Sequence, residues 1–294
     1  MGRPLANVIK TYPRRGSMQQ FRLDALTAFD CFRCHRTKKS KLVVVYDDDW
    51  NRFLCNGCYG FLLSVYKIKA GTGPENEKAA RLGDLLLNLA TKEQAYRAAE
   101  LSEYAQRGEE QLSDTALRFI GTSEYVASAM QDRTDLDWSA AVVGICKALE
   151  LECVRRLVEP LRQSVAGADL SQDLADRDLG RVATYCRGTS DTPPELGTIR
   201  HLLETASHSK TRAQSSTILR ALKRLLAGWP QSAWLLDEDG ALKQLARVTA
   251  GYRNRAVHLD AMTSADYRSC RALVLGEVGA MWNLVRATQA PSRK

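Results

Sequence analysis

The sequence lacks a run of apolar residues long enough to cross a membrane. A membrane helix needs about 18 to 20 consecutive apolar residues. The longest apolar stretches here, such as the Leu-Val-Val-Val-Tyr run that ends at Tyr46, are interrupted by charges within a few positions. The first ten residues also lack the apolar segment of a secretory signal. We therefore expect a cytoplasmic protein that does not associate with a membrane.

Short motifs of several enzyme classes are also missing. The chain contains no G-x-S-x-G, no Gly-rich phosphate loop ending in Lys and Ser or Thr, no G-x-G-x-x-G and no H-E-x-x-H. Serine-hydrolase, nucleotide-cofactor and metalloprotease activities of these types therefore have no residues to carry them.

The positive charge is confined to the first quarter of the chain. The formal net charge is +8, and residues 1–71 carry 13 Lys and Arg against five Asp and Glu, whereas the rest carries 29 of each sign. Most of the excess lies between Lys10 and Lys41. A surface that binds an anion, nucleic acid included, is expected there first, although a solvated charged face is equally common.

Four of the eight cysteines form two pairs with the spacing of a metal site. In each pair two residues separate the cysteines, and 20 residues separate the pairs, which are Cys31 with Cys34 and Cys55 with Cys58. Two such turns complete the tetrahedron that Zn²⁺ prefers. Because four thiolates leave no position for a water molecule, we predict a structural zinc rather than a catalytic one. His35 in place of one cysteine, or disulfides, are the weaker alternatives.

The residues around these pairs are typical of a zinc ribbon. Valine-rich residues 42–46 predict a strand, and residues 47–51 predict a turn. Gly57 and Gly60 are candidates for positive φ angles close to the metal.

From Glu75 onward apolar residues recur at helical spacing almost everywhere. The fold class expected is mainly α, with a helical bundle after a small zinc-ribbon module. We predict a zinc-ribbon module at 1–71, a helical connector at 72–131 and a helical domain at 132–294. Helices are expected at about 75–107, with a possible break near 91, and at 114–130, 138–163, 170–186, 196–206, 213–228, 240–258 and 264–288.

One segment near the end of the chain suggests catalysis. Arg253 and Asn254 are followed by His258, which provides a fixed cation near a titratable base. Histidine can exchange a proton with a ribose 2′-hydroxyl or a leaving 5′-oxygen near neutral pH, and arginine can bind the scissile phosphate at two points. The weaker alternative is that His258 only caps its helix.

The Arg-Asn-x-x-x-His segment, before a last helix beginning Ser-Ala-Asp-Tyr, resembles the HEPN superfamily. The upstream helix Ala-Ala-Val-Val-Gly-Ile-Cys-Lys-Ala-Leu-Glu also resembles the first HEPN helix, with its polar position at Glu150. The resemblance covers about residues 132–288. It implies a dimeric all-α domain with a metal-independent endoribonuclease site between protomers, as is frequent in toxin–antitoxin and anti-phage defence systems. Arg253 and His258 would be catalytic, Asn254 would orient them, and Glu150 would hold Arg253.

Helix geometry gives a separate reason to expect a homodimer. On a regular α-helix, residues five apart are about 140° apart around the axis, so Arg253 and His258 would not converge on one phosphate within a chain. A second copy across a twofold axis would supply the missing partner. Two functions are therefore expected as alternatives. One is an RNA endonuclease that leaves a 2′,3′-cyclic phosphate and a 5′-hydroxyl and has a regulatory protein partner. The other is a non-catalytic adaptor or regulator whose zinc ribbon binds protein or nucleic acid.

Overall fold

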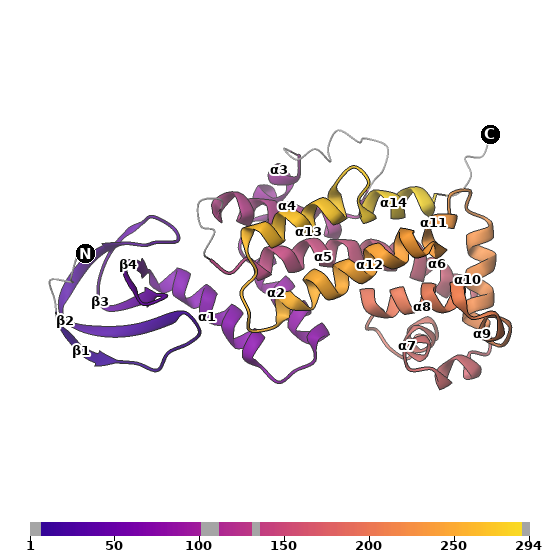
Figure 1. Ribbon diagram of the computed structural model, residues 1–294, viewed down its shortest axis with the longest axis horizontal. Helices are drawn as coiled ribbons and strands as arrows, with labels where there is room; N and C mark the ends of the chain where they lie inside the picture. Colours follow the sequence, from indigo (N-terminus) through magenta and orange to yellow (C-terminus); the bar gives the residue numbers. More distant parts are fainter. Residues whose placement is uncertain (1–6, 101–111, 131–135, 290–294) are drawn as a thin grey trace.

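A computed structural model describes residues 7–100, 112–130 and 136–289, and shows a small sheet at one end of an elongated helical body (Figure 1). The sheet is antiparallel in the order β1-β2-β3-β4, formed by Val8–Thr11, Met18–Asp30, Thr37–Tyr46 and Asp49–Leu54. Helix α1 (Asn56–Ala70) leads from the sheet into the helical body. The mainly α fold with a small β module is thus confirmed.

The two faces of the sheet pack differently. Val44 and Leu54 on one face join the main core together with Phe61, Leu62 and Val65 of α1. On the other face, Val43 lies in a separate small cluster with Leu23 and Phe29. The predicted strand at 42–46 is the end of β3, and the predicted turn is shorter, because Asp47 and Asp48 alone form it with positive φ angles. Strands β1 and β2 are not among the elements predicted from the sequence.

The helical body follows the predicted periodicity over most of its length. Its longer helices are α2 (Glu75–Leu87), α3 (Lys92–Glu100), α4 (Asp114–Met130), α5 (Ser139–Cys153), α7 (Arg177–Cys186), α8 (Leu196–His208), α10 (Thr217–Ala227), α13 (Ser264–Leu275) and α14 (Ala280–Ala287). Shorter helices are α6 (Glu159–Ser164), α9 (Lys210–Ser215), α11 (Ala233–Leu236) and α12 (Lys243–Val248). None of the helices in the described part of the chain is both long and apolar enough to span a membrane.

Helix α5 is the centre of this body. Every residue of α5 except Lys147 and Leu151 is buried. Helices α2 and α4, from the predicted connector at 72–131, pack directly on α5 together with α13. The residues of all four helices belong to one hydrophobic core, which also includes the α1 side of the sheet.

Several predicted helices are interrupted. The expected helix at 75–107 divides into α2 and α3, and its residues 101–107 lie outside the described residues. The expected helix at 264–288 ends at Gly276 and restarts after Gly279. A Cβ atom at Gly279 would lie 2.5 Å from the carbonyl oxygen of Val274, so the break depends on a residue without a side chain.

The prediction of a regular helix at 240–258 is wrong, and the irregular turns found there change the geometry of the candidate site. Gly240 has non-helical angles (φ −86°, ψ −120°) inside a π-helical turn, Glu238–Leu242. After α12 comes a second π-helical turn, Thr249–Arg253, and then a 3₁₀ turn, Arg255–Val257. The 140° angle that we expected between Arg253 and His258 therefore does not apply, because it assumes a regular α-helix.

A buried lysine joins α1 to the helical body. The side chain of Lys69 is 2% exposed, and its ammonium donates hydrogen bonds to Asp137 Oδ2 (2.9 Å), Ser139 Oγ (3.1 Å) and the carbonyl oxygen of Asp260 (2.7 Å). A buried ammonium requires such partners because its desolvation is costly. Lys69 therefore fixes the end of α1 against the start of α5 and the loop that follows His258.

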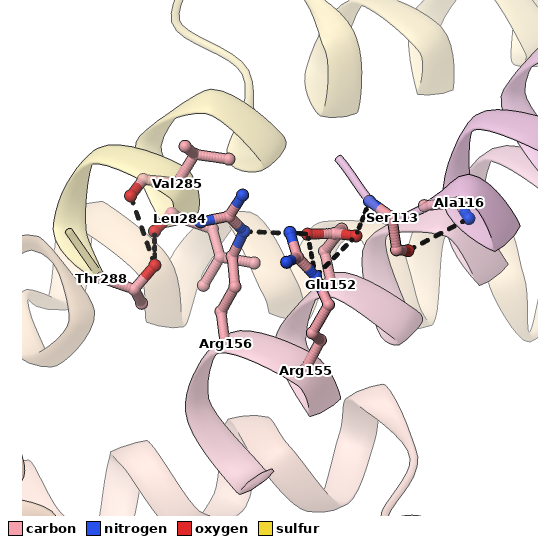
Figure 2. A network of polar contacts seen from close by, with 8 residues as sticks. All are labelled: Ser113, Ala116, Glu152, Arg155, Arg156, Leu284, Val285 and Thr288. Atoms are coloured by element: carbon pink, nitrogen blue, oxygen red, sulfur yellow. Dashed lines mark hydrogen bonds and ion pairs between the residues drawn. The ribbon is translucent and has the colours of Figure 1, made fainter. Parts of the chain in front are cut away.

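A second buried charge fixes α4 to α5 (Figure 2). Glu152 is fully buried and accepts hydrogen bonds from the backbone N–H of Ser113 (2.8 Å), Arg155 Nη2 (2.6 Å) and Arg156 Nε (2.8 Å). Burial alone would raise the pKa of Glu152, but these donors outweigh it, and the pKa lies below its ordinary value of 4.5. The carboxylate is therefore ionised at neutral pH.

Glu152→Gln is expected to lower the free energy of unfolding by about 2 kcal/mol at pH 7. The lowered pKa means that the carboxylate contributes fully above pH 4.5 and loses its contribution as the pH falls through the folded-state pKa. Urea unfolding of parent and variant between pH 7 and 3 should show a difference that shrinks below pH 4.5. Glu204→Gln is the matched control, because its partly exposed pair with Arg200 contributes little. A difference that stays constant down to pH 3 would contradict this role.

Candidate functional site

The four paired cysteines converge as their spacing predicts. The sulfur atoms of Cys31, Cys34, Cys55 and Cys58 all lie within 4.8 Å of one another. Cys31 and Cys34 belong to the turn between β2 and β3, whereas Cys55 and Cys58 lie at the junction of β4 and α1. The group comprises these four cysteines without His35, and all four are free thiols, which disfavours the disulfide alternative.

Backbone hydrogen bonds shape the turn that carries Cys31 and Cys34. The backbone N–H of Cys31 donates to the carbonyl oxygen of Arg36 (3.0 Å), and the backbone N–H of His35 donates to that of Cys31 (2.8 Å). His35, directly after Cys34, takes a positive φ of 56°. The positive φ angles expected at Gly57 and Gly60 are absent, because these glycines lie in the right-handed backbone of α1.

The geometry of the cluster suits a metal ion that prefers sulfur. Four sulfurs about 2.3 Å from a central zinc would be about 3.8 Å apart, and the sulfurs of Cys34 and Cys55 are 3.7 Å apart. Hydrogen bonds from Cys58 and from backbone N–H groups, including that of Cys55, outweigh burial and lower the pKa of Cys31 to about 4. The same hydrogen bond raises the pKa of Cys58, so without an ion the two sulfurs share one proton, which a bound metal would displace.

The Arg253 guanidinium lies in a buried ionic network. Arg253 is 6% exposed, and its Nη2 atom lies 3.0 Å from Glu195 Oε2 and 3.8 Å from Glu150 Oε2. Its Nη1 atom donates to Asn254 Oδ1 at 3.2 Å. Glu150 also contacts Lys147 Nζ at 2.5 Å and accepts the backbone N–H of Leu196 at 3.2 Å. Two cations and two carboxylates make this network neutral.

Glu195 and Lys147 are the members of this network that sequence reasoning missed. Glu195 is the N-cap residue of α8, immediately after Pro193 and Pro194. The two prolines indicate a break in the chain, but no residue pattern shows that the break faces Arg253, 58 positions further on. The contact between Glu150 and Arg253, in contrast, is the one that the sequence led us to expect.

His258 lies in a different environment. Its side chain is 58% exposed, and its Nε2 atom lies 3.1 Å from Oε1 of Glu75, the first residue of α2. His258 follows the 3₁₀ turn and has an extended backbone (φ −82°, ψ 169°). Arg253 and His258 therefore contact carboxylates from different elements, and the chain does not direct both side chains to one shared partner.

This arrangement separates a fixed cation from an accessible base. The π-helical turn that ends at Arg253 has a hydrogen bond from the backbone N–H of Asn254 to the carbonyl oxygen of Thr249 (2.9 Å), and such turns are frequent at functional sites. The Glu75 carboxylate can orient the His258 ring, which leaves the second ring nitrogen available for proton transfer.

Comparisons of the chain with protein-family models, curated proteins and solved structures give no match.

Arg253→Met is expected to destabilise the protein by about 3 to 5 kcal/mol, because the substitution leaves the carboxylates of Glu150 and Glu195 without their shared cation. Arg255→Met is the matched control two positions away. Arg255 is 54% exposed and contacts Asp266 at 3.2 Å, so its loss should change stability by at most about 0.5 kcal/mol. Chemical unfolding at pH 7 measures both variants, and equal effects would show that the Arg253 network does not stabilise the fold.

Proposed function

We propose that this protein is a metal-independent endoribonuclease of the HEPN type. The observation that carries the proposal is the exposed His258, oriented by the Glu75 carboxylate at 3.1 Å and placed directly after a segment that Arg253 anchors. The Arg-Asn-x-x-x-His motif and the contact of Glu150 with Arg253 support it, because both match the pattern expected for this superfamily.

In this proposal His258 carries the proton transfers. Its free ring nitrogen accepts the proton of a ribose 2′-hydroxyl while the 2′-oxygen forms a bond to the adjacent phosphorus. The bond from phosphorus to the 5′-oxygen breaks, and the protonated ring donates its proton to that oxygen. The products are a 2′,3′-cyclic phosphate and a 5′-hydroxyl, and no metal takes part in the reaction.

Arg253 has a positioning role in this mechanism. Its buried guanidinium, held by Glu150 and Glu195, fixes the backbone that presents His258. The direct contact of Arg253 with the scissile phosphate, and the orienting role of Asn254, stay predictions from the HEPN resemblance. The homodimer through the helical domain is part of the same proposal, since a second protomer would bring a further set of charged groups to the phosphate.

The cellular role that fits such an enzyme is that of a toxin or an anti-phage effector. A ribonuclease without a metal requirement is active wherever it meets RNA, so a regulatory protein partner would have to restrain it. The sulfur-only donor set also leads us to propose Zn²⁺ as the ion at the four cysteines. This zinc would be structural, because four thiolates fill its coordination sphere.

A non-catalytic adaptor is the second candidate function. The burial of Arg253 in a neutral ionic network favours it, because an arginine held in this way has a sufficient structural role without catalysis. In that case the helical body would serve only as a scaffold for the cysteine module and its basic surface.

His258→Ala is expected to reduce RNA cleavage at least 100-fold, the usual contribution of a general acid–base group. Cleavage by the parent should persist in EDTA over short incubations and give 2′,3′-cyclic phosphate ends. His208→Ala is the matched control, because His208 is also exposed and lies 2.8 Å from a carboxylate, that of Glu238. Expression of the parent and of the His208 variant should be toxic, whereas the His258 variant, which loses cleavage, should not be. If the His258 and His208 variants cleave RNA like the parent, or if the parent does not cleave RNA, the adaptor function is supported instead.

Cys55→Ser is expected to abolish binding of about one zinc ion per chain, as measured by elemental analysis of the purified protein. The helical signal in far-ultraviolet circular dichroism should be retained, because most residues of the hydrophobic core come from the helices of the body, although Cys31 and Cys58 belong to the same core. Cys186→Ser, at a buried cysteine outside the cluster, should leave the zinc content unchanged. Zinc content that stays the same in the Cys55 variant would exclude this cluster as the metal site.

A further inference from the structure

A basic pocket opens onto the cysteine cluster at the start of α1, with Cys34, Cys55 and Cys58 among its lining residues. Its volume is about 480 Å³, far more than a single ion requires. Four cationic residues, Arg33, Arg36, Lys38 and Lys39, line it from the turn between β2 and β3 and from the start of β3. Asn56 and Gly57 line it from the first turn of α1, and no acidic residue is among its lining residues.

The cations of this pocket are not neutralised by the chain. Arg36, Lys38 and Lys39 are exposed, and in the described part of the chain no carboxylate pairs with any of their side chains. Arg33 is held differently, with Nη1 3.6 Å from the sulfur of Cys58 and its guanidinium 4.6 Å from the centre of the Phe61 ring. The Nε atom of Arg33 is buried without a hydrogen-bond partner. Arg33 therefore forms a fixed cationic floor, and Arg36, Lys38 and Lys39 form an exposed rim.

The adjoining metal centre and helix leave the pocket attractive to an anion. With Zn²⁺ bound as proposed, the four thiolates and the ion would carry a charge of −2, and the four cations would leave the pocket near +2. Helix α1 begins here with Cys55 as its N-cap residue and has no acidic residue in its first turn. The positive end of its dipole and its free N–H groups add to the attraction of a phosphate.

We propose that this basic pocket binds a backbone phosphate of RNA. The RNA part of this inference rests on the nuclease function proposed above, and α1 supplies the connection. Its first residues, Asn56 and Gly57, line the pocket, and Lys69 is the last residue but one of its 15. The Lys69 ammonium lies 2.7 Å from the carbonyl oxygen of Asp260, two positions after His258. The helix spans about 22 Å, which corresponds to about six stacked nucleotides at about 3.4 Å each. One strand held in the pocket can therefore reach His258.

The test compares RNA binding by two double variants that remove the same charge. Arg36→Glu with Lys38→Glu alters the pocket, whereas Lys10→Glu with Lys41→Glu alters exposed residues of β1 and β3 that do not line it. All proteins carry His258→Ala to prevent cleavage. Affinity for a fluorescent 15-nucleotide single-stranded RNA is measured by anisotropy at several salt concentrations. Zinc content and circular dichroism confirm that each variant is folded.

We expect the pocket variant to bind the 15-mer about tenfold more weakly, and the control variant to change affinity less than twofold. The slope of log affinity against log salt concentration should fall by about 0.7 in the pocket variant, because the pocket holds one phosphate and each phosphate contact on a single strand contributes about 0.7. A four-nucleotide RNA, too short to span α1, should be cleaved equally by the parent and by the pocket variant with His258 restored.

Equal weakening by the two double variants would overturn the proposal, because it would reduce the effect to net charge. Displacement of the RNA by polyglutamate at equal charge concentration would also overturn it, in favour of an acidic protein partner. Absence of RNA binding by the His258→Ala parent would overturn it as well. Because binding is measured without cleavage, a pocket that binds RNA in a protein without nuclease activity would refute the proposed function and leave this inference intact.

Discussion

The buried ammonium of Lys69 is the interaction that unites the molecule. It is the point at which α1 from the cysteine module, the start of α5 and the loop after His258 meet, through Asp137, Ser139 and the Asp260 carbonyl. A charge that is 2% exposed has to keep all of its partners, because losing one would leave it unsatisfied in a low-dielectric interior. The position of His258 therefore depends on where the cysteine module is anchored.

Helix α5 carries two further buried charges, which lie on opposite sides of the helix. Glu150 and Glu152 are two positions apart, which places them about 200° apart around the helix. Glu150 faces Arg253 and the start of α8, whereas Glu152 faces Ser113 and the two arginines that follow it (Figure 2). Both carboxylates are satisfied by several donors, the condition under which buried ionic groups are tolerated. One helix thereby fixes both the α4 side and the candidate catalytic side.

Charged residues behave differently in the cysteine module and in the helical body. The basic excess of residues 1–71 lies beside a cluster of four cysteines that could hold a metal ion, while many charges of the helical body pair with one another. Exposed cations without carboxylate partners remain free to contact an external anion. The guanidinium of Arg253, by contrast, pairs with carboxylates of the chain. The chemistry proposed for the helical body therefore rests on His258 and its partner Glu75.

The sequence by itself determined the features that depend on local spacing. The spacing of the cysteine pairs determined the sulfur cluster, because each pair forms a short turn that brings its two sulfur atoms close together. The period of the apolar residues determined most of the helices. Tertiary structure alone decided the rest. Strand β1 is exposed throughout and β2 buries only Met18, Leu23 and Phe29, so both depend on partners within the sheet. The π-helical turn at Arg253 has no periodic signal. The pairing of Arg253 with Glu195, and of His258 with Glu75, joins residues distant in the chain, so only packing could bring them together.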